Sequence, residues 1–141
     1  MCTLNLSNEQ DIIMTKPLLL VVDDDRDLEE PICELAEDMG FEVKFETSAK
    51  KFQETYIATN PVGIVMDIVM PEMDGNELLE WVGLQNRFTP IILISGHDGK
   101  YIQVAEMLGK ASGNIILGGL TKPIRLGDLE LMLQDILDAG Q

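Results

Sequence analysis

The stretch LLLVVDDDRD, residues 18 to 27, joins five apolar residues directly to three consecutive aspartates. An apolar run of this length, rich in Leu and Val, is typical of a strand buried on both faces of a parallel sheet. Asp23, Asp24 and Asp25 follow at once, and carboxylates this close repel one another, which costs stability unless a cation or solvent compensates. The sequence therefore predicts a buried strand that ends at a binding site.

The composition describes one folded domain with an acidic surface. A length of 141 residues suits a single domain, and 45% hydrophobic with 25% charged residues is ordinary for a globular protein. Acidic residues outnumber basic ones by 25 to 10, for a net charge of −15. Such a surface repels nucleic acid phosphates and anionic lipids, so we expect no direct binding of nucleic acid and no membrane partner.

No targeting or membrane-spanning segment stands out. The chain has no run near the roughly 20 apolar residues of a membrane span, and its first residues lack the pattern of a signal peptide. Cys2 and Cys33 are too few and too far apart for a disulfide framework or a zinc site. We therefore expect free thiols and a cytoplasmic location. Residues 1–16 are predicted as a loose extension, with Met14 as an alternative start, 17–138 as the domain and 139–141 as a tail.

Apolar runs alternate with stretches of helical period along the chain, which predicts an α/β fold with helices on both faces of a parallel sheet. The predicted strands are residues 18–22, 43–46, 63–66, 91–94 and about 115–120. The predicted helices are residues 27–40, 48–58, 75–85, 99 to about 112, and 127–140. Gly40, Gly113 and Gly140 stand where glycine commonly ends a helix.

Polar residues follow the predicted strands where ligands bind in open parallel sheets, at the carboxyl ends. Asp23 and Asp24 follow the first strand and Asp67 the third, while Ser95 and Lys122 follow the fourth and fifth. Carboxylates, a hydroxyl and an ammonium group are therefore expected to converge at one edge of the sheet.

Four motifs at these strand ends, LLLVVDDD, IVMDIVMPEMDG, IILISG and LTKP, resemble in their order the receiver domain of two-component response regulators. The resemblance covers residues 17 to 137. It implies the flavodoxin-like receiver fold, with five parallel strands in the order 2-1-3-4-5. It also implies that Asp67 is the phosphoacceptor, that Ser95 is the switch hydroxyl, and that Lys122 precedes a proline whose peptide bond is commonly cis.

The same resemblance implies a divalent cation, Mg²⁺ or Mn²⁺, held by Asp23, Asp24, Asp67 and the backbone carbonyl of Val69. Oxygen ligands of this kind suit Mg²⁺, and the cation would offset the repulsion among the carboxylates. Phosphoryl transfer needs in-line positioning and neutralisation of the phosphoryl oxygens, which the cation, Lys122 and a hydroxyl can supply. Asp67 would then attack as the nucleophile and form an aspartyl phosphate.

Partners also follow from the resemblance. It implies a histidine kinase or phosphotransfer protein as donor, and a signalling domain that catalyses only its own phosphorylation and dephosphorylation. An output domain or protein partner is expected on the face formed by the fourth helix, the last strand and the last helix. Whether the domain forms a homodimer is left open.

Many receivers carry, three positions before the lysine, an aromatic residue that swings inward. Gly119 stands there, so we expect phosphorylation to act mainly on residues 96–108. The segment GNIILGGLTKP, residues 113–123, is similar to receivers joined to cyclic-di-GMP phosphodiesterase domains.

Plainer roles and other functions stay open. Ser95 could be a turn residue and Lys122 an exposed one, Asp25 is expected to face solvent or cap a helix, and His97 is expected in an exposed loop near the site mouth. We expect the side chains of Met66, Met70, Met73 and Trp81 to pack in the core or loops. A phosphohydrolase of the haloacid dehalogenase type needs a second Asp where this chain has Val69. A pseudo-receiver, which only binds partners, typically lacks the acidic residues that are present here.

Overall fold

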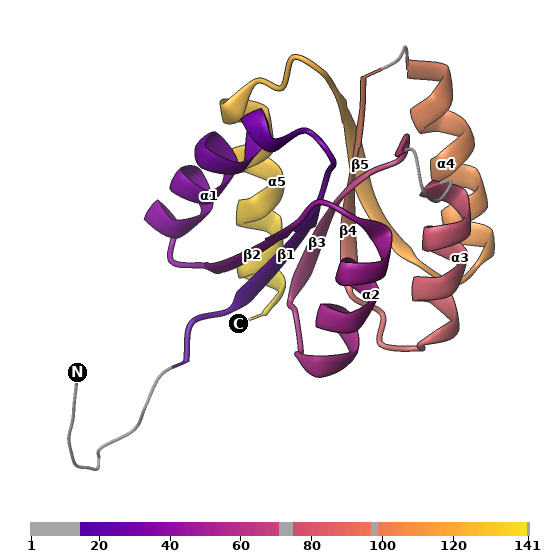
Figure 1. The fold of residues 1–141 in the computed structure, drawn as a ribbon, viewed down its shortest axis with the longest axis horizontal. Helices are drawn as coiled ribbons and strands as arrows, with labels where there is room; N and C mark the ends of the chain where they lie inside the picture. The colour runs from indigo at the N-terminus through magenta and orange to yellow at the C-terminus, as the bar shows by residue number, and fades with distance from the viewer. Residues whose placement is uncertain (1–14, 71–74, 97–98, 141) are drawn as a thin grey trace.

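A computed structural model describes residues 15–70, 75–96 and 99–140 of the chain, and Figure 1 shows their fold. The predictions for residues 1–14, for Met73 and for His97 lie outside these ranges. Strands and helices alternate, as the sequence predicts. In chain order the elements are β1 (Leu18–Val22), a 3₁₀ turn (Arg26–Leu28), α1 (Glu29–Asp38), β2 (Glu42–Glu46), α2 (Ala49–Ala58), β3 (Gly63–Asp67), α3 (Gly75–Leu84), β4 (Pro90–Ser95), α4 (Gly99–Ala111), β5 (Ile115–Thr121) and α5 (Leu126–Ala139).

The five strands form one parallel sheet in the order β2-β1-β3-β4-β5, which confirms the predicted topology. β1 and β3 occupy the middle, and every residue of both strands is buried. Because crossover helices cover both faces of such a sheet, its central strands are apolar along their whole length. The apolar run LLLVV at residues 18–22 is such a strand, buried along its whole length.

Helices form a layer on each face of the sheet (Figure 1). Along β1, Leu20 and Val22 pack into a cluster with residues of α2, α3 and α4, while Leu19 and Val21 pack with residues of α1 and α5. The alternation follows from the two-residue period of a strand. The two clusters lie on opposite faces of the sheet and together form the core.

Most predicted elements differ from the structure by one residue at an end, and three differences have a visible structural cause. The predicted first helix, residues 27–40, is a 3₁₀ turn followed by a shorter α-helix, and Asp25 caps the turn by accepting the N–H of Asp27 at 3.0 Å. β2 begins one residue earlier than predicted, because the N–H of Glu42 donates to the carbonyl of Pro17 at 2.8 Å. β5 is irregular opposite Ile91 and Ile92, where its register shifts by one residue next to Gly118, whose φ is +159°.

The start of α3 packs directly on the backbone that follows β3. A Cβ atom at Gly75 would lie 2.4 Å from Cα of Ile68, and the N–H of Gly75 donates to the Ile68 carbonyl at 3.2 Å. Only glycine fits such a close approach. This contact ties Ile68, the residue after Asp67, to the start of α3. Among the residues that the structure describes, no helix combines the length and apolar character needed to cross a bilayer.

Candidate functional site

The polar residues predicted at the strand ends do meet at one edge of the sheet. Asp23 directly follows β1, Asp67 and Ser95 are the last residues of β3 and β4, and Lys122 directly follows β5. Asp23 and Ser95 are fully buried, and Asp67 is only 2% exposed. Polar side chains are rarely this buried without a structural or functional partner.

Three carboxylates form a compact group at this edge. Oxygen atoms of Asp23, Asp24 and Asp67 all lie within 4.8 Å of one another. Asp24 is exposed, whereas the other two are buried, so the group is open to solvent on one side. Asp25, the third acidic residue of the run, serves as the cap described above, as the sequence analysis expected.

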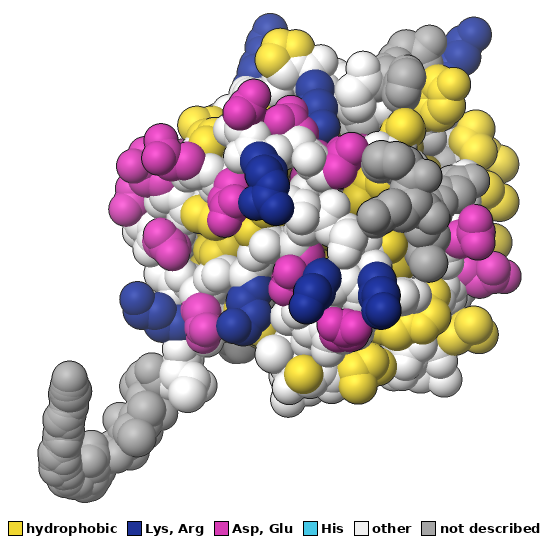
Figure 2. Space-filling model, in the orientation of Figure 1, with side chains coloured by type: hydrophobic (Ala, Val, Ile, Leu, Met, Phe, Trp, Pro, Cys, Tyr) yellow, Lys and Arg dark blue, Asp and Glu magenta, His cyan; other side chains and the backbone are white. Residues whose placement is uncertain are grey.

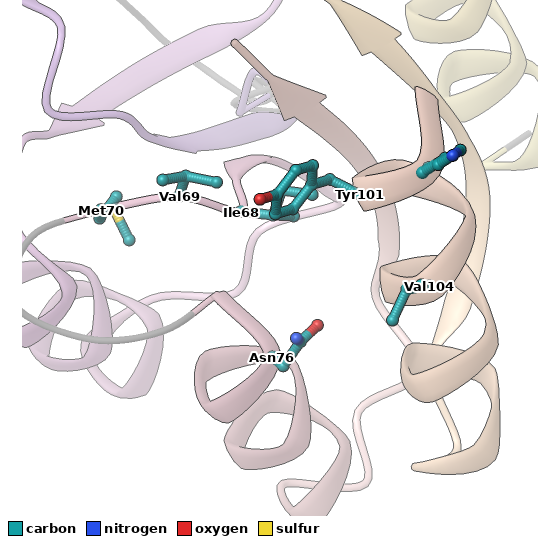
Figure 3. A pocket seen from close by; sticks show the side chains of 7 residues that line it. Ile68, Val69, Met70, Asn76, Tyr101 and Val104 are labelled. Carbon is teal, nitrogen blue, oxygen red and sulfur yellow. The ribbon is translucent and has the colours of Figure 1, made fainter. Parts of the chain in front are cut away.

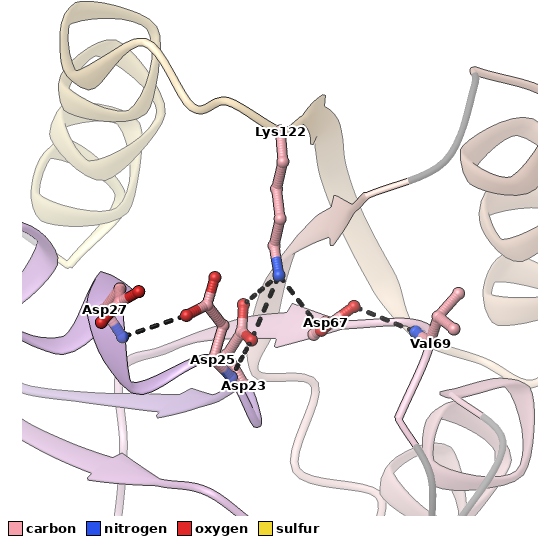
Figure 4. A network of polar contacts seen from close by, with 6 residues as sticks. All are labelled: Asp23, Asp25, Asp27, Asp67, Val69 and Lys122. Atoms are coloured by element: carbon pink, nitrogen blue, oxygen red, sulfur yellow. Dashed lines mark hydrogen bonds and ion pairs between the residues drawn. The ribbon is translucent and has the colours of Figure 1, made fainter.

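Lys122 supplies the positive charge that faces this group. Its Nζ atom lies 3.2 Å from both carboxylate oxygens of Asp23 and 3.5 Å from Oδ2 of Asp67 (Figure 4). The Lys122–Pro123 peptide bond is cis, as the family resemblance implies. Lys122 follows β5 at the edge of the sheet, and its ammonium group reaches the carboxylates at the ends of β1 and β3.

Backbone groups fix the two buried carboxylates. The N–H of Asp25 donates to Oδ1 of Asp23 at 2.8 Å, and the N–H of Val69 donates to Oδ1 of Asp67 at 3.0 Å. Both bonds span two residues, the geometry of a turn closed by an aspartate side chain. They leave the second oxygen of Asp67 facing Lys122 (Figure 4).

The environment changes the titration of both central groups. Burial raises the pKa of Asp67 to about 6; the hydrogen bond from Val69 opposes this change, and the nearby charge of Asp23 adds to it. Burial lowers the pKa of Lys122, but the charges of Asp67 and Asp23 outweigh burial, so its pKa lies above the ordinary value. At neutral pH the site holds a charged ammonium and a mostly ionised Asp67.

The donor set fits a hard divalent cation. Oδ2 of Asp23 is buried and accepts no hydrogen bond among the described residues, although Lys122 lies 3.2 Å away. Lys122 is one positive charge facing three carboxylates, so a bound cation would compensate the charge that the ammonium group leaves. Asp24 faces solvent, and this suits Mg²⁺, which keeps several of its waters. The carbonyl of Val69 stays a predicted ligand, since the observed contact of that residue is through its N–H.

Ser95 ends β4 beside the same site. Ser95 pairs with Thr121 of the neighbouring strand β5, and its backbone carbonyl accepts a hydrogen bond from the N–H of Lys122 at 2.8 Å. The preceding residue, Ile94, pairs with Asp67 in the neighbouring strand. The switch role of the Ser95 hydroxyl stays a prediction, but its backbone joins the strand ends that carry Asp67 and Lys122.

A pocket that no sequence motif predicts lies between the end of β3 and the helices α3 and α4 (Figure 3). Its volume is about 580 Å³, and its lining is mostly apolar. Its lining residues are Ile68, Val69, Met70, Asn76, Lys100, Tyr101 and Val104. Helical period alone could not reveal it, because three separate elements form its walls.

The surface carries the negative charge expected from the composition. Figure 2 shows acidic side chains gathered over α1, where Glu29, Glu30, Glu34 and Glu37 are exposed. Met66 is fully buried in the core, and the partly buried Trp81 packs against the core, edge-on to Tyr56 with ring centroids 5.6 Å apart, as predicted. Met70 is also buried, at 8% exposure, although it lines the pocket.

Comparison with known proteins gives a consistent result. The model of the response regulator receiver domain family matches residues 19–134. The C4-dicarboxylate transport transcriptional regulatory protein DctD of Pseudomonas aeruginosa is 32% identical over 93 residues, which are 66% of this chain and 20% of that protein. The response regulator protein TmoT of Ectopseudomonas mendocina is 32% identical over 118 residues, with 79% of this chain and 49% of that protein covered. The chain thus spans less than half the length of these relatives.

Solved structures resemble the fold closely. The receiver domain of the Francisella response regulator 1452 has a TM-score of 0.75 at 28% identity, and the match covers 89% of this chain and 99% of that one. The chemotaxis protein CheY4 of Vibrio cholerae has a TM-score of 0.74 at 25% identity, with coverage of 86% and 99%. In these cases the similarity extends over nearly the whole of the solved domain.

Proposed function

The chain belongs to the response regulator receiver domain family, and we propose that it accepts a phosphoryl group on Asp67 in a reaction that requires Mg²⁺ or Mn²⁺. The observation that carries the proposal is the arrangement of three carboxylates within 4.8 Å, with the Lys122 ammonium 3.2 Å from Asp23 and 3.5 Å from Asp67. A folded chain gains nothing in stability from crowding three carboxylates, so the arrangement favours a role in chemistry.

The proposed reaction uses the groups as follows. A carboxylate oxygen of Asp67 attacks phosphorus and forms a new P–O bond, while the bond from phosphorus to the donor breaks and the donor keeps the electron pair. With a pKa of about 6, the Asp67 carboxylate is ionised at neutral pH and needs no base. Lys122 neutralises a phosphoryl oxygen, and Ser95 donates its hydroxyl to another.

Asp23, Asp24 and Asp67, with the carbonyl of Val69, would hold the cation. When bound, the cation neutralises charge on the phosphoryl oxygens and lowers the repulsion between them and the carboxylates. Oδ2 of Asp23 is buried and accepts no hydrogen bond among the described residues, and its charged neighbour there is the Lys122 ammonium at 3.2 Å; the close approach of Asp24 and Asp67 to this carboxylate supports the assignment.

The donor in the cell would be a phosphohistidine of a histidine kinase or of a phosphotransfer protein. The product would change how the domain meets an output domain or a protein partner, and the domain itself would catalyse only the gain and loss of its own phosphoryl group. Support for the output face comes from exposed apolar residues on α4, β5 and α5. They are Met107, Leu108, Ile115, Leu117, Leu126 and Leu131. A surface with so many exposed apolar side chains favours binding to protein.

The proposal is tested with a small phosphodonor. Wild-type protein incubated with acetyl phosphate and Mg²⁺ should gain the mass of one phosphoryl group, and omission of the metal should prevent the gain. Asp67→Asn should gain none, because the nucleophile is gone. Asp25→Asn serves as the matched control, since Asn keeps the cap and leaves the three-carboxylate group unchanged. An adduct of unchanged yield in Asp67→Asn would refute the assignment, and turnover of the donor without an adduct would favour a phosphohydrolase.

A further inference from the structure

We propose that residues 9–14 of this chain bind in a groove at the amino-terminal edge of the sheet, between the start of β1 and the last turns of α5 (Figure 1). The volume of the groove is about 840 Å³. It lies at the opposite end of the strands from Asp67, and no residue of the carboxylate site lines it. The segment would therefore bind whether or not Asp67 carries a phosphoryl group.

The groove has an apolar lining that comes from separate parts of the chain. The apolar lining residues are Pro17, Leu18, Met39, Val62, Ile136 and Leu137. Met39, Val62 and Leu137 are only partly buried, and they pack on the edge of the core cluster that contains residues of α1 and α5. Partly exposed apolar side chains around a hollow favour an apolar occupant.

Backbone contacts fix the walls of the groove. The N–H of Glu42 donates to the carbonyl of Pro17, and the N–H of Val62 donates to the carbonyl of Leu18, both at 2.8 Å. A Cβ atom at Gly63 would lie 2.6 Å from Cδ1 of Ile136, so α5 packs directly on the start of β3. The groove is thus a preformed site, which lowers the entropic cost of binding a segment there.

The path of the chain brings residues 9–14 to the groove. Thr15, Lys16 and Pro17 line it, and β1 then enters the sheet between β2 and β3. Because an extended chain covers at most about 3.6 Å per residue, residues 12–14 lie within roughly 11 Å of Thr15. A segment tethered this closely has a high effective concentration at the groove, so weak contacts are sufficient for binding.

The segment ends in side chains that match the apolar lining. Ile12, Ile13 and Met14 are three consecutive large apolar residues directly before Thr15. Burial of each such side chain in the groove would remove apolar surface from water and stabilise the bound segment. The sequence analysis expected a loose extension over residues 1–16, and the groove offers the last part of that extension a binding site.

The charges of the segment and the groove are complementary. Glu9 and Asp11 are the charged side chains of residues 9–14, and Lys44 is an exposed lining residue of the groove. Lys16 also lines it, and neither lysine forms an ion pair among the described residues. In a chain with a net charge of −15, two lysines at one groove attract an acidic segment.

Amide hydrogen exchange of the whole chain tests the proposal, with each rate compared with that of a free peptide of the same sequence over residues 1–17. The amides of residues 12–14 should exchange roughly 10-fold or more slowly in the protein than in the peptide. Ile12→Ser combined with Ile13→Ser should abolish this protection. Leu4→Ser combined with Leu6→Ser is the matched control, because it removes two apolar side chains outside the proposed segment, and it should keep the protection.

A second pair of variants tests the charges. Lys44→Glu should lower the protection of residues 12–14 by roughly 3-fold or more, and this effect should shrink as salt is added. Lys50→Glu makes the same change of charge at an exposed position that does not line the groove, and it should keep the protection. Wild-type protection in Lys44→Glu would overturn the assigned charge pairing.

Two further results would overturn the proposal. One is peptide-like exchange of residues 12–14 in the wild-type protein, and the other is full protection in the Ile12→Ser and Ile13→Ser double variant. Protection that increases with protein concentration would place the segment in the groove of a second copy, and it would overturn binding within one chain. Phosphorylation of Asp67 enters none of these measurements, so their outcome is separate from that of the proposed function.

Discussion

Lys122 and Asp67 form an ion pair, with 3.5 Å between Nζ and Oδ2, although the two residues are separated by 55 positions in the chain. The pair joins the end of β5 to the end of β3, with β4 between them in the sheet. The same ammonium group lies 3.2 Å from Asp23 at the end of β1. The ammonium group of Lys122, which follows the edge strand β5, thus compensates the charges of the two buried carboxylates that follow or end the central strands.

Removal of the Lys122 ammonium group should destabilise the domain. Lys122→Met leaves two buried carboxylates without their counter-charge, and we expect it to lower the free energy of unfolding by about 3 kcal/mol at pH 7 without Mg²⁺. Lower pH should restore part of this loss, because protonation of Asp67 removes one of the unpaired charges. Urea unfolding measures the effect. Lys110→Met, at an exposed position of α4, should change stability little, and an equal loss in both variants would contradict the assigned role.

The raised pKa of Asp67 predicts how stability depends on pH. Because the folded state raises this pKa from 3.8 to about 6, folding favours the protonated carboxyl, and the ionised form costs stability above pH 6. Asp67→Asn should therefore be more stable than wild type at pH 7 to 8, by up to about 3 kcal/mol in the free energy of unfolding. The difference should shrink as pH falls through 6 and vanish near pH 4. A difference that is constant over this range would show that titration of Asp67 is not its source.

Mg²⁺ should stabilise the wild-type protein, and this stabilisation should depend on Asp24. A ligand that binds only the folded state raises the melting temperature, so millimolar Mg²⁺ should raise it by several degrees. Asp24→Asn should melt higher than wild type without metal, since one of three crowded charges is removed, and should respond less to the metal. Asp25→Asn should keep the full response. If Asp24→Asn also kept it, Asp24 would not belong to the cation site.

Arg87 provides a variant that changes stability away from the site. Its guanidinium group donates to the carbonyls of Tyr56 and Thr59 at the end of α2, and its Cζ atom lies 4.6 Å from the centre of the Tyr56 ring. Arg87→Ala should lower the free energy of unfolding by about 1 to 2 kcal/mol, because the last carbonyls of the helix lose a charged donor. Arg125→Ala, at an exposed position, should cost less. The yield of phosphorylated protein should be the same for Arg87→Ala and wild type. A lower yield in Arg87→Ala would show that reduced stability by itself lowers phosphorylation.

Local patterns in the sequence were sufficient for the sheet, because apolar runs and helical period report directly on burial. The convergence of Asp67 and Lys122 was also predictable, since both follow strands of one parallel sheet. The irregular register beside Gly118 was not, because it depends on how β5 meets β4. The contact of Arg87 with the end of α2 escaped prediction for the same reason, because it joins residues that are far apart in the chain and that no repeating pattern of the sequence connects.

The measurement that tests the central claim most directly is the chemical identity of residue 67 after reaction. Borohydride reduces the acyl phosphate of an aspartate to homoserine and leaves a free carboxylate unchanged. Protein treated with acetyl phosphate and Mg²⁺, then reduced and digested, should contain homoserine at position 67 and aspartate at positions 23, 24 and 25. Homoserine at another of these positions, or aspartate throughout in protein whose Mg²⁺ response is intact, would contradict the account.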